Sequence, residues 1–107
     1  MTRAINRVLI SGNVTRVFYA NTGNGKDACT FTLASDRHAR GDVITAFVKV
    51  NVYGNGLVDT CRKRLLQGGY VFVEGELMNR DGQHGELTEV RAQKVIFTGP
   101  EEVINGS

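Results

Sequence analysis

A helical repeat runs through the stretch Gly56-Leu57-Val58-Asp59-Thr60-Cys61-Arg62-Lys63-Arg64-Leu65-Leu66-Gln67. Its apolar residues recur at spacings of three and four, which is typical of one face of an α-helix; they are Leu57, Val58, Cys61 and Leu65. Asn55 is placed to cap the start, and Gly68-Gly69 is a glycine stop at the end. The sequence therefore predicts a helix over residues 56–67.

The chain on both sides of this stretch consists of β-rich runs separated by turn-forming residues. The predicted strands are Ile5–Val14 (continuing past a bend at Gly12 through Val17-Phe18-Tyr19), Ala28–Ser35, Val43–Tyr53, Tyr70–Leu77 and Glu86–Thr98. The residues between them form polar, glycine-bearing clusters at 21–27, 36–42 and 79–85. This pattern predicts an antiparallel sheet with three loops.

The order of these elements selects a fold. Three strands, one helix and two further strands is the order of an OB-fold, whereas an SH3-like barrel lacks so complete a helix at that place. The predicted class is all-β with one helix, a five-stranded antiparallel OB-fold barrel whose helix lies between strands 3 and 4. We expect residues 1–100 to form this domain and residues 101–107 to be a flexible C-terminal end.

Composition excludes several classes of protein. The 107 residues are 41% hydrophobic and 22% charged, as in soluble globular domains. No run approaches the roughly 20 apolar residues of a membrane span, and the N-terminus lacks the apolar core of a secretory signal. Cys29 and Cys61 have no metal-ligand spacing. We therefore expect no membrane segment, no metal and no cofactor, and a cytoplasmic location.

The third predicted strand carries the functional argument, because side chains alternate across a strand. One face is apolar throughout and is predicted to pack the core; it consists of Ile44, Ala46, Val48, Val50 and Val52. The other face should meet solvent; it carries Val43, Thr45, Phe47, Lys49, Asn51 and Tyr53. Exposed aromatic rings offer stacking surfaces to unpaired bases, and a lysine between them suits phosphates. This face is the predicted site for a single-stranded nucleic acid.

Further candidates flank this face. The net charge is only +2, but basic residues gather on the predicted loops and near the first strand. They are Lys26, Arg37, Arg40 and Arg80 on the loops, with Arg3, Arg7 and Arg16 near the first strand. Tyr19 and His38 are additional candidates for stacking. The predicted DNA-binding set is Phe47, Lys49, Tyr53, Arg7, Arg3, Arg37, His38, Arg40, Arg80 and Tyr19.

Several stretches, in order over residues 3–99, resemble the bacterial-type single-stranded DNA-binding proteins. They are Asn6-Arg7-Val8-Leu9-Ile10-Ser11-Gly12-Asn13-Val14-Thr15, Phe31-Thr32-Leu33-Ala34, Val50-Asn51-Val52-Tyr53-Gly54, Gly69-Tyr70-Val71-Phe72-Val73-Glu74-Gly75-Glu76-Leu77 and Leu87-Thr88-Glu89-Val90. The resemblance implies an OB-fold that binds single-stranded DNA with little sequence preference and protects it during replication, recombination or repair. Phe47 and Tyr53 fall on the family's stacking positions, and Lys49 and Arg7 fall on basic ones.

The resemblance also implies a homo-oligomer, usually a tetramer, with a dimer as the alternative and the first strand in dimer contacts. The chain departs from the family in three ways. It has no tryptophan, it offers His38 and His84 where loop aromatics are common, and residues 101–107 do not match the acidic tail that recruits replication and repair proteins. We expect weaker binding or a shorter site, in a truncated chain or a short form from a phage or mobile element.

Two other readings remain open, and a third is disfavoured. A tail-less primosome accessory protein with a single OB domain would also fit the length and the lack of tryptophan. An OB-fold module for oligomerisation or protein interaction would use Phe47 and Tyr53 as interface residues, although Lys49 between them disfavours a dry interface. An enzyme is not expected, because His38 and His84 lie in polar loops and no phosphate-binding loop, dinucleotide fingerprint or nucleophile elbow is present.

Overall fold

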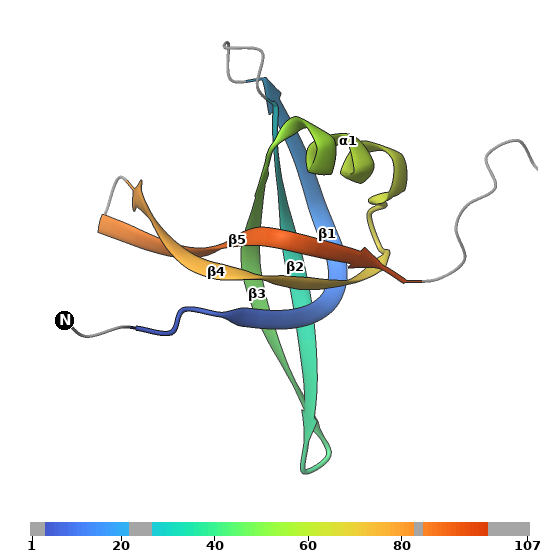
Figure 1. The fold of residues 1–107 in the computed structure, drawn as a ribbon. Helices are drawn as coiled ribbons and strands as arrows, with labels where there is room; N and C mark the ends of the chain where they lie inside the picture. Colours follow the sequence, from blue (N-terminus) through green and yellow to red (C-terminus); the bar gives the residue numbers. More distant parts are fainter. Residues whose placement is uncertain (1–3, 22–26, 83–84, 99–107) are drawn as a thin grey trace, which may run out of the picture.

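The strands close into one barrel. The computed structural model describes residues 4–21, 27–82 and 85–98. Its elements are β1 (Val8–Asn21), β2 (Asp27–Ala39), β3 (Asp42–Tyr53), α1 (Asn55–Arg64), β4 (Tyr70–Gly82) and β5 (Gly85–Phe97). The strand order is β1-β2-β3-β5-β4, and α1 lies at one end of the barrel between β3 and β4 in the chain (Figure 1). The predicted OB-fold is confirmed.

One seam of the barrel is parallel. β3 and β5 run in the same direction and pair through Val50 with Val90 and Asn51 with Arg91, whereas the other pairings are antiparallel. α1 and β4 intervene between β3 and β5, and this crossover returns the chain in the same direction. The barrel therefore closes with only a short ladder at this seam.

β1 belongs to both halves of the barrel. Its first half pairs with β4 and its second half with β2, and Asn13 is in register with both Tyr70 and Ala34. Gly12 lies at this transition, where a Cβ would overlap the Ala34 carbonyl. The bend predicted at Gly12 is thus a point of close strand approach that only glycine permits.

The core lies between the inner faces of the strands and α1. Its fully buried strand residues include Val14, Cys29, Phe31, Leu33, Val50, Val52, Val73 and Val90. From α1, Val58 and Cys61 are buried among them, as the helical spacing predicts. The helix ends at Arg64 because Leu65 is already extended, so the predicted end at Gln67 is three residues too long. Asn55 does not cap it: Gly54 is the N-cap, and Asn55 Oδ1 accepts from the Asp27 amide instead.

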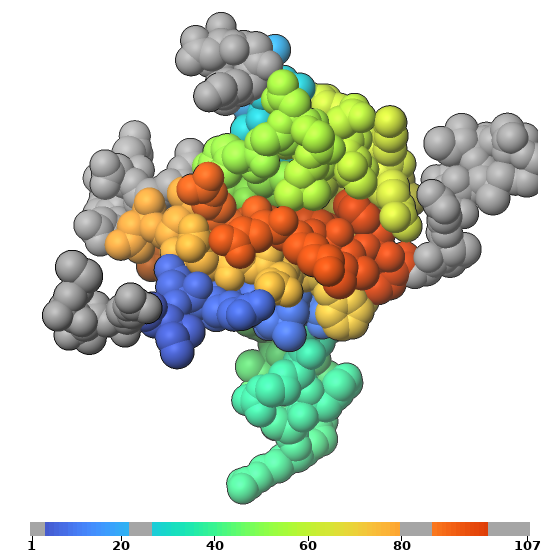
Figure 2. Space-filling model, viewed as in Figure 1, coloured from blue at the N-terminus to red at the C-terminus, as the bar shows by residue number. Residues whose placement is uncertain are grey.

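The hairpin of β2 and β3 is longer than predicted. The segment 36–42, expected to be a loop, is paired strand except for a turn at Arg40-Gly41. Positive φ angles of 52° and 84° at these residues fit the tight turns that join twisted strands. The outer part of the hairpin, residues 35–46, extends beyond the barrel and is called the arm here (Figures 1 and 2).

The third strand was predicted to be buried along one whole face, but the part of that face in the arm is exposed. Val50 and Val52 are buried, but Ile44 is 50% exposed and Ala46 is exposed, because this part of β3 has no opposing layer. The segment 79–85 was likewise predicted to be a turn, yet β4 and β5 pair out to Gly82 and Gly85. Within the described ranges, no helix is long and apolar enough to cross a membrane.

Candidate nucleic-acid interface

A hollow of about 510 Å³ lies on the outer face of β1, β2 and β3. We call it the groove. Its lining consists of Arg16, Phe18, Ala20, Ala28, Thr30, Thr32, Lys49, Asn51 and Tyr53. These residues alternate with the core residues of the same three strands, so the groove is the back of the sheet whose front packs the core. Two of the predicted residues, Lys49 and Tyr53, line it.

The middle of the groove is cationic. Lys49 is in register with Thr32, and Thr32 is in register with Arg16, so the three side chains form one row across the three strands. Lys49 and Arg16 are both exposed. A row of two cations and a hydroxyl can neutralise a phosphate and donate hydrogen bonds to its oxygens.

Aromatic rings lie on both sides of the cationic row. Phe47 precedes Lys49 by two residues, lies in register with Ala34 and is 70% exposed. Tyr53 and Phe18 lie on the other side, with 41% and 66% of their surfaces exposed. Large exposed aromatic groups on one sheet face mark a surface that a partner covers. Phe47 itself lies beside the hollow and is not part of its lining.

The floor beneath Lys49 and Tyr53 is a buried polar cluster. Asn51 was predicted to meet solvent, but it is 1% exposed. Its Nδ2 donates a 2.6 Å hydrogen bond to Oε1 of Glu89 on β5, and Thr30 Oγ1 donates a 2.9 Å bond to its Oδ1. These bonds fix the Asn51 amide in place and satisfy it without solvent.

Arg91 supports Tyr53 from the neighbouring strand. The Arg91 guanidinium lies 5.5 Å from the centroid of the Tyr53 ring, within the range of a cation–π contact. The parallel pairing of Asn51 with Arg91 places the two side chains side by side on β3 and β5. Tyr53 is thus contacted by an arginine from β5 while it lines the groove over β2.

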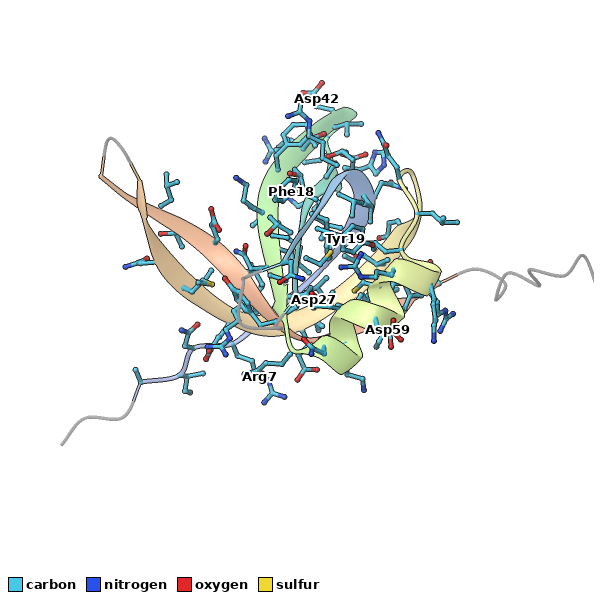
Figure 3. The ribbon with its side chains drawn as sticks, turned by 90° about the horizontal axis from the view of Figure 1, so that it is seen from above. Arg7, Phe18, Tyr19, Asp27, Asp42 and Asp59 are labelled. Carbon is cyan, nitrogen blue, oxygen red and sulfur yellow. The ribbon has the colours of Figure 1, made fainter. Side chains whose placement is uncertain are left out.

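Tyr19, a sequence candidate for stacking, does not line the groove. It lies on the opposite face of β1 from Phe18 and packs against the core, with the Arg62 guanidinium of α1 4.6 Å from its ring centroid. Figure 3 shows Tyr19 nearer to α1 than Phe18 is.

Burial, with a hydrogen bond to Cys29, raises the pKa of Tyr19 to about 12. The Cys61 thiol donates a hydrogen bond to the Cys29 sulfur, and this raises the pKa of Cys61 and lowers the pKa of Cys29.

The remaining predicted residues lie away from the hollow. Arg7 precedes β1 and forms a 2.8 Å ion pair with Glu74 of β4. Arg37 and His38 lie on the β2 part of the arm and Arg40 in its turn, all exposed. Alternation places His38 on the groove side of the arm and Arg37 on the opposite side, because they pair with Val43 and Ile44.

The side chains of three predicted basic residues are not among those that the structure describes. Arg3 and Lys26 lie outside the described residues, and Arg80 belongs to β4 with its side chain undescribed. Among the residues that are described, no group of three or more His, Cys, Asp or Glu side chains is placed to hold a metal. Cys29 and Cys61 are free and buried.

Sequence reasoning missed Phe18 and Arg91 as candidates and noted Arg16 only as nearby charge. Val17-Phe18-Tyr19-Ala20 contains no polar residue, so alternation could not show which side faces the core. A register shift between Val14 and Arg16 adds to the difficulty. Arg91 contributes only through the β3–β5 pairing, for which the sequence carries no local signal.

The barrel and its groove define an OB-fold protein with a face suited to single-stranded nucleic acid. The family model described as "Single-strand binding protein family" matches residues 5–98. The chain belongs to this family, which consists of non-catalytic DNA-binding proteins, and membership assigns single-stranded DNA as its ligand.

Comparison with solved structures agrees on the fold. The chain is similar to a structure described as "Plasmodium falciparum SSB complex with ssDNA", with a TM-score of 0.80 and 23% sequence identity. The match covers 92% of this chain and 99% of that chain, so the two chains share the fold over nearly their full lengths. A comparison with curated protein sequences finds no match.

Proposed function

We propose that single-stranded DNA lies along the groove, with its bases on Phe47, Tyr53 and Phe18 and its phosphates on Lys49 and Arg16. The supporting observation is that three exposed aromatic rings and a cationic row share one face of the sheet. Any base can stack on an aromatic ring, and this accounts for binding with little sequence preference. Binding would protect single strands during replication, recombination or repair.

The proposed site favours unpaired over paired DNA. A duplex hides the faces of its bases inside the stack, so Phe47, Tyr53 and Phe18 would have nothing to contact except the backbone. The cationic row alone would bind a duplex weakly and in a strongly salt-dependent way. The protein is proposed to act by binding alone, without catalysis, in the cytoplasm, where free thiols such as Cys29 and Cys61 persist.

We also propose that the chain assembles into a homo-oligomer, a tetramer or alternatively a dimer. The outer face of β1, β4 and β5 carries Leu9, Phe72 and Ile96, with exposures of 76%, 40% and 47%. Ser11 of β1, Phe72 of β4 and Ile96 of β5 are in register, so the apolar residues are neighbours across the three strands. Figure 2 views the molecule from the side of β5, β4 and the start of β1. A second copy that covers this face would join several grooves and raise avidity.

The test is fluorescence anisotropy with a labelled oligo-dT and a duplex of equal length, at low and high salt. We expect salt-sensitive binding to the single strand and much weaker binding to the duplex. Lys49→Gln should reduce the salt slope by about one counterion. Lys63→Gln is the matched control, because Lys63 is exposed on α1 and paired with Asp59. Equal affinity for both DNAs would instead indicate a protein-interaction module.

The assembly is tested separately by light scattering coupled to gel filtration. Leu9→Glu should lower the mass of the particle, because a carboxylate cannot be buried in an apolar interface without a large cost. Leu66→Glu, another exposed leucine but one just after α1, should leave the mass unchanged. A monomer at all concentrations would refute the oligomer and leave the groove proposal standing.

A further inference from the structure

We propose that one end of the groove is a seat for a single unpaired base, between the rings of Phe18 and Tyr53, with Arg91 as a positioning residue behind Tyr53. The proposal rests on the proposed binding of single-stranded DNA in the groove. It assigns distinct roles within that groove: the seat takes one base, and Phe47 is a separate platform on the far side of the cationic row.

The walls of the seat come from the two outer strands of the three. Phe18 is on β1 and Tyr53 on β3, with β2 between them, so their backbones are separated by two strand spacings, roughly 10 Å. They are also offset by two residues along the strands, because Phe18 is in register with Thr30 whereas Tyr53 is in register with Ala28. The seat is the space between these two side chains, diagonally across β2.

The floor of the seat is formed by β2, where Thr30 is in register with Phe18 and Ala28 is in register with Tyr53. Ala28 of β2 is in register with Ala20 of β1 and with Tyr53 of β3, and both alanines line the groove. Methyl side chains at these positions keep the space between the rings open. A larger apolar residue at either position would stand upright from the sheet and occupy that space, without removing an aromatic ring or a charge.

Arg91 restricts the orientation of the Tyr53 ring. The cation–π contact of 5.5 Å places a guanidinium beside the ring from the β5 side, and the ring also lines the groove from the β2 side. Holding the ring in this orientation reduces the rotamer freedom that would otherwise be lost on binding. Arg91 acts through Tyr53, so it is a positioning residue and not a phosphate contact.

The seat is tested with Ala28→Leu and Ala20→Leu against two ligands, oligo-dT and an abasic strand of the same length. Each variant should weaken binding of oligo-dT by roughly tenfold, as loss of one stacked base does. Binding of the abasic strand should stay unchanged, because the cationic row is intact. Ala46→Leu, an exposed alanine of the arm, is the matched control and should bind both ligands as the wild type does.

A second variant keeps the test decisive if the leucines disturb folding. Phe18→Ala should reproduce the selective loss for oligo-dT, and Phe18→Tyr should restore it. Wild-type affinity for oligo-dT in Ala28→Leu and Phe18→Ala would overturn the seat. Failure of the wild-type protein to prefer single strands would be a different result, because it would overturn the proposed function itself.

Arg91 is tested by the salt dependence of binding. Arg91→Met keeps an unbranched chain but lacks the charge, so it should weaken oligo-dT binding severalfold with the salt slope unchanged and little effect on the abasic strand. Arg91→Lys should recover part of the affinity through a weaker contact with the ring. A fall of the slope by about one, as for Lys49→Gln, would make Arg91 a phosphate contact and overturn the positioning role.

Discussion

Asn51 on β3 donates a 2.6 Å hydrogen bond through Nδ2 to Oε1 of Glu89 on β5, and both side chains are almost completely buried. The two strands pair through only Val50 with Val90 and Asn51 with Arg91. The side-chain bond therefore supplements the shortest ladder of the barrel. It also fixes the floor of the groove, because Thr30 donates to the other end of the same amide.

This relationship predicts a loss of stability when Asn51 is replaced by leucine. The leucine cannot donate to Glu89 or accept from Thr30, and a buried polar group that loses a partner costs about 1–3 kcal/mol. Urea unfolding should show this decrease in the free energy of unfolding. Thr45→Val is a suitable control, since its 2.6 Å bond to Asp36 is exposed on the arm and its loss should change stability little. Equal stability of Asn51→Leu and wild type would contradict the structural role.

A second prediction concerns the stacking platforms. Phe47→Ala and Tyr53→Ala should each weaken oligo-dT binding by roughly 5- to 100-fold, because one stacked base contributes about 1–3 kcal/mol. Phe47 is 70% exposed, so its truncation should leave the melting temperature nearly unchanged. Leu66→Ala removes an exposed apolar residue beyond α1 and serves as the control for both measurements. If neither aromatic truncation changes the affinity, stacking on β3 is ruled out.

The sequence was sufficient to predict the order of elements, the helix and the exposure of Phe47 and Tyr53 on one face of β3. Those predictions depend on periodicity and turn chemistry, which are local. The length of the arm was missed because Asp36, Arg37 and His38 have polar, loop-like side chains, yet in the structure they pair with β3. Strand pairing can override weak local preference where no core contact is needed.

Only the β3 side of the groove could be predicted from the sequence, for a related reason. Lys49 and Tyr53 stand out because their neighbours on β3 are apolar valines. Phe18 and Tyr19 are adjacent aromatic residues in an apolar stretch, and only the register of β1 with β2 shows that Phe18 faces the groove and Tyr19 the helix. Arg91 and Glu89 depend on the parallel seam, which links residues far apart in the chain.

A third prediction follows from close backbone approach at Gly75. A Cβ at this position would overlap the carbonyl of Arg91 on β5, and backbone cannot move aside as a flexible side chain can. Gly75→Ala should therefore lower the melting temperature by several degrees or more and disturb Arg91 itself. Gly56→Ala is the matched control: it lies in α1 with nothing within 4 Å of its Cβ position. Alanine there should be neutral or stabilise by up to about 1 kcal/mol. A Gly75→Ala protein as stable as wild type would contradict this packing.

The last prediction concerns the ionisation of Tyr19. Burial raises its pKa to about 12, with a further contribution from its hydrogen bond to Cys29, while the Arg62 guanidinium acts in the opposite direction. The folded protein thus favours the neutral phenol. The contribution of the Tyr19 phenol to the free energy of unfolding is fully present below about pH 10, the pKa of tyrosine in the unfolded chain. It is lost as the pH rises from about 10 towards about 12. Absorbance at 295 nm should show a late step for Tyr19, which is absent in Tyr19→Phe and shifted still higher in Arg62→Gln. Tyr53→Phe should leave the late step in place. A late step that survives Tyr19→Phe would contradict the burial of Tyr19 under α1 and reopen its assignment to the groove.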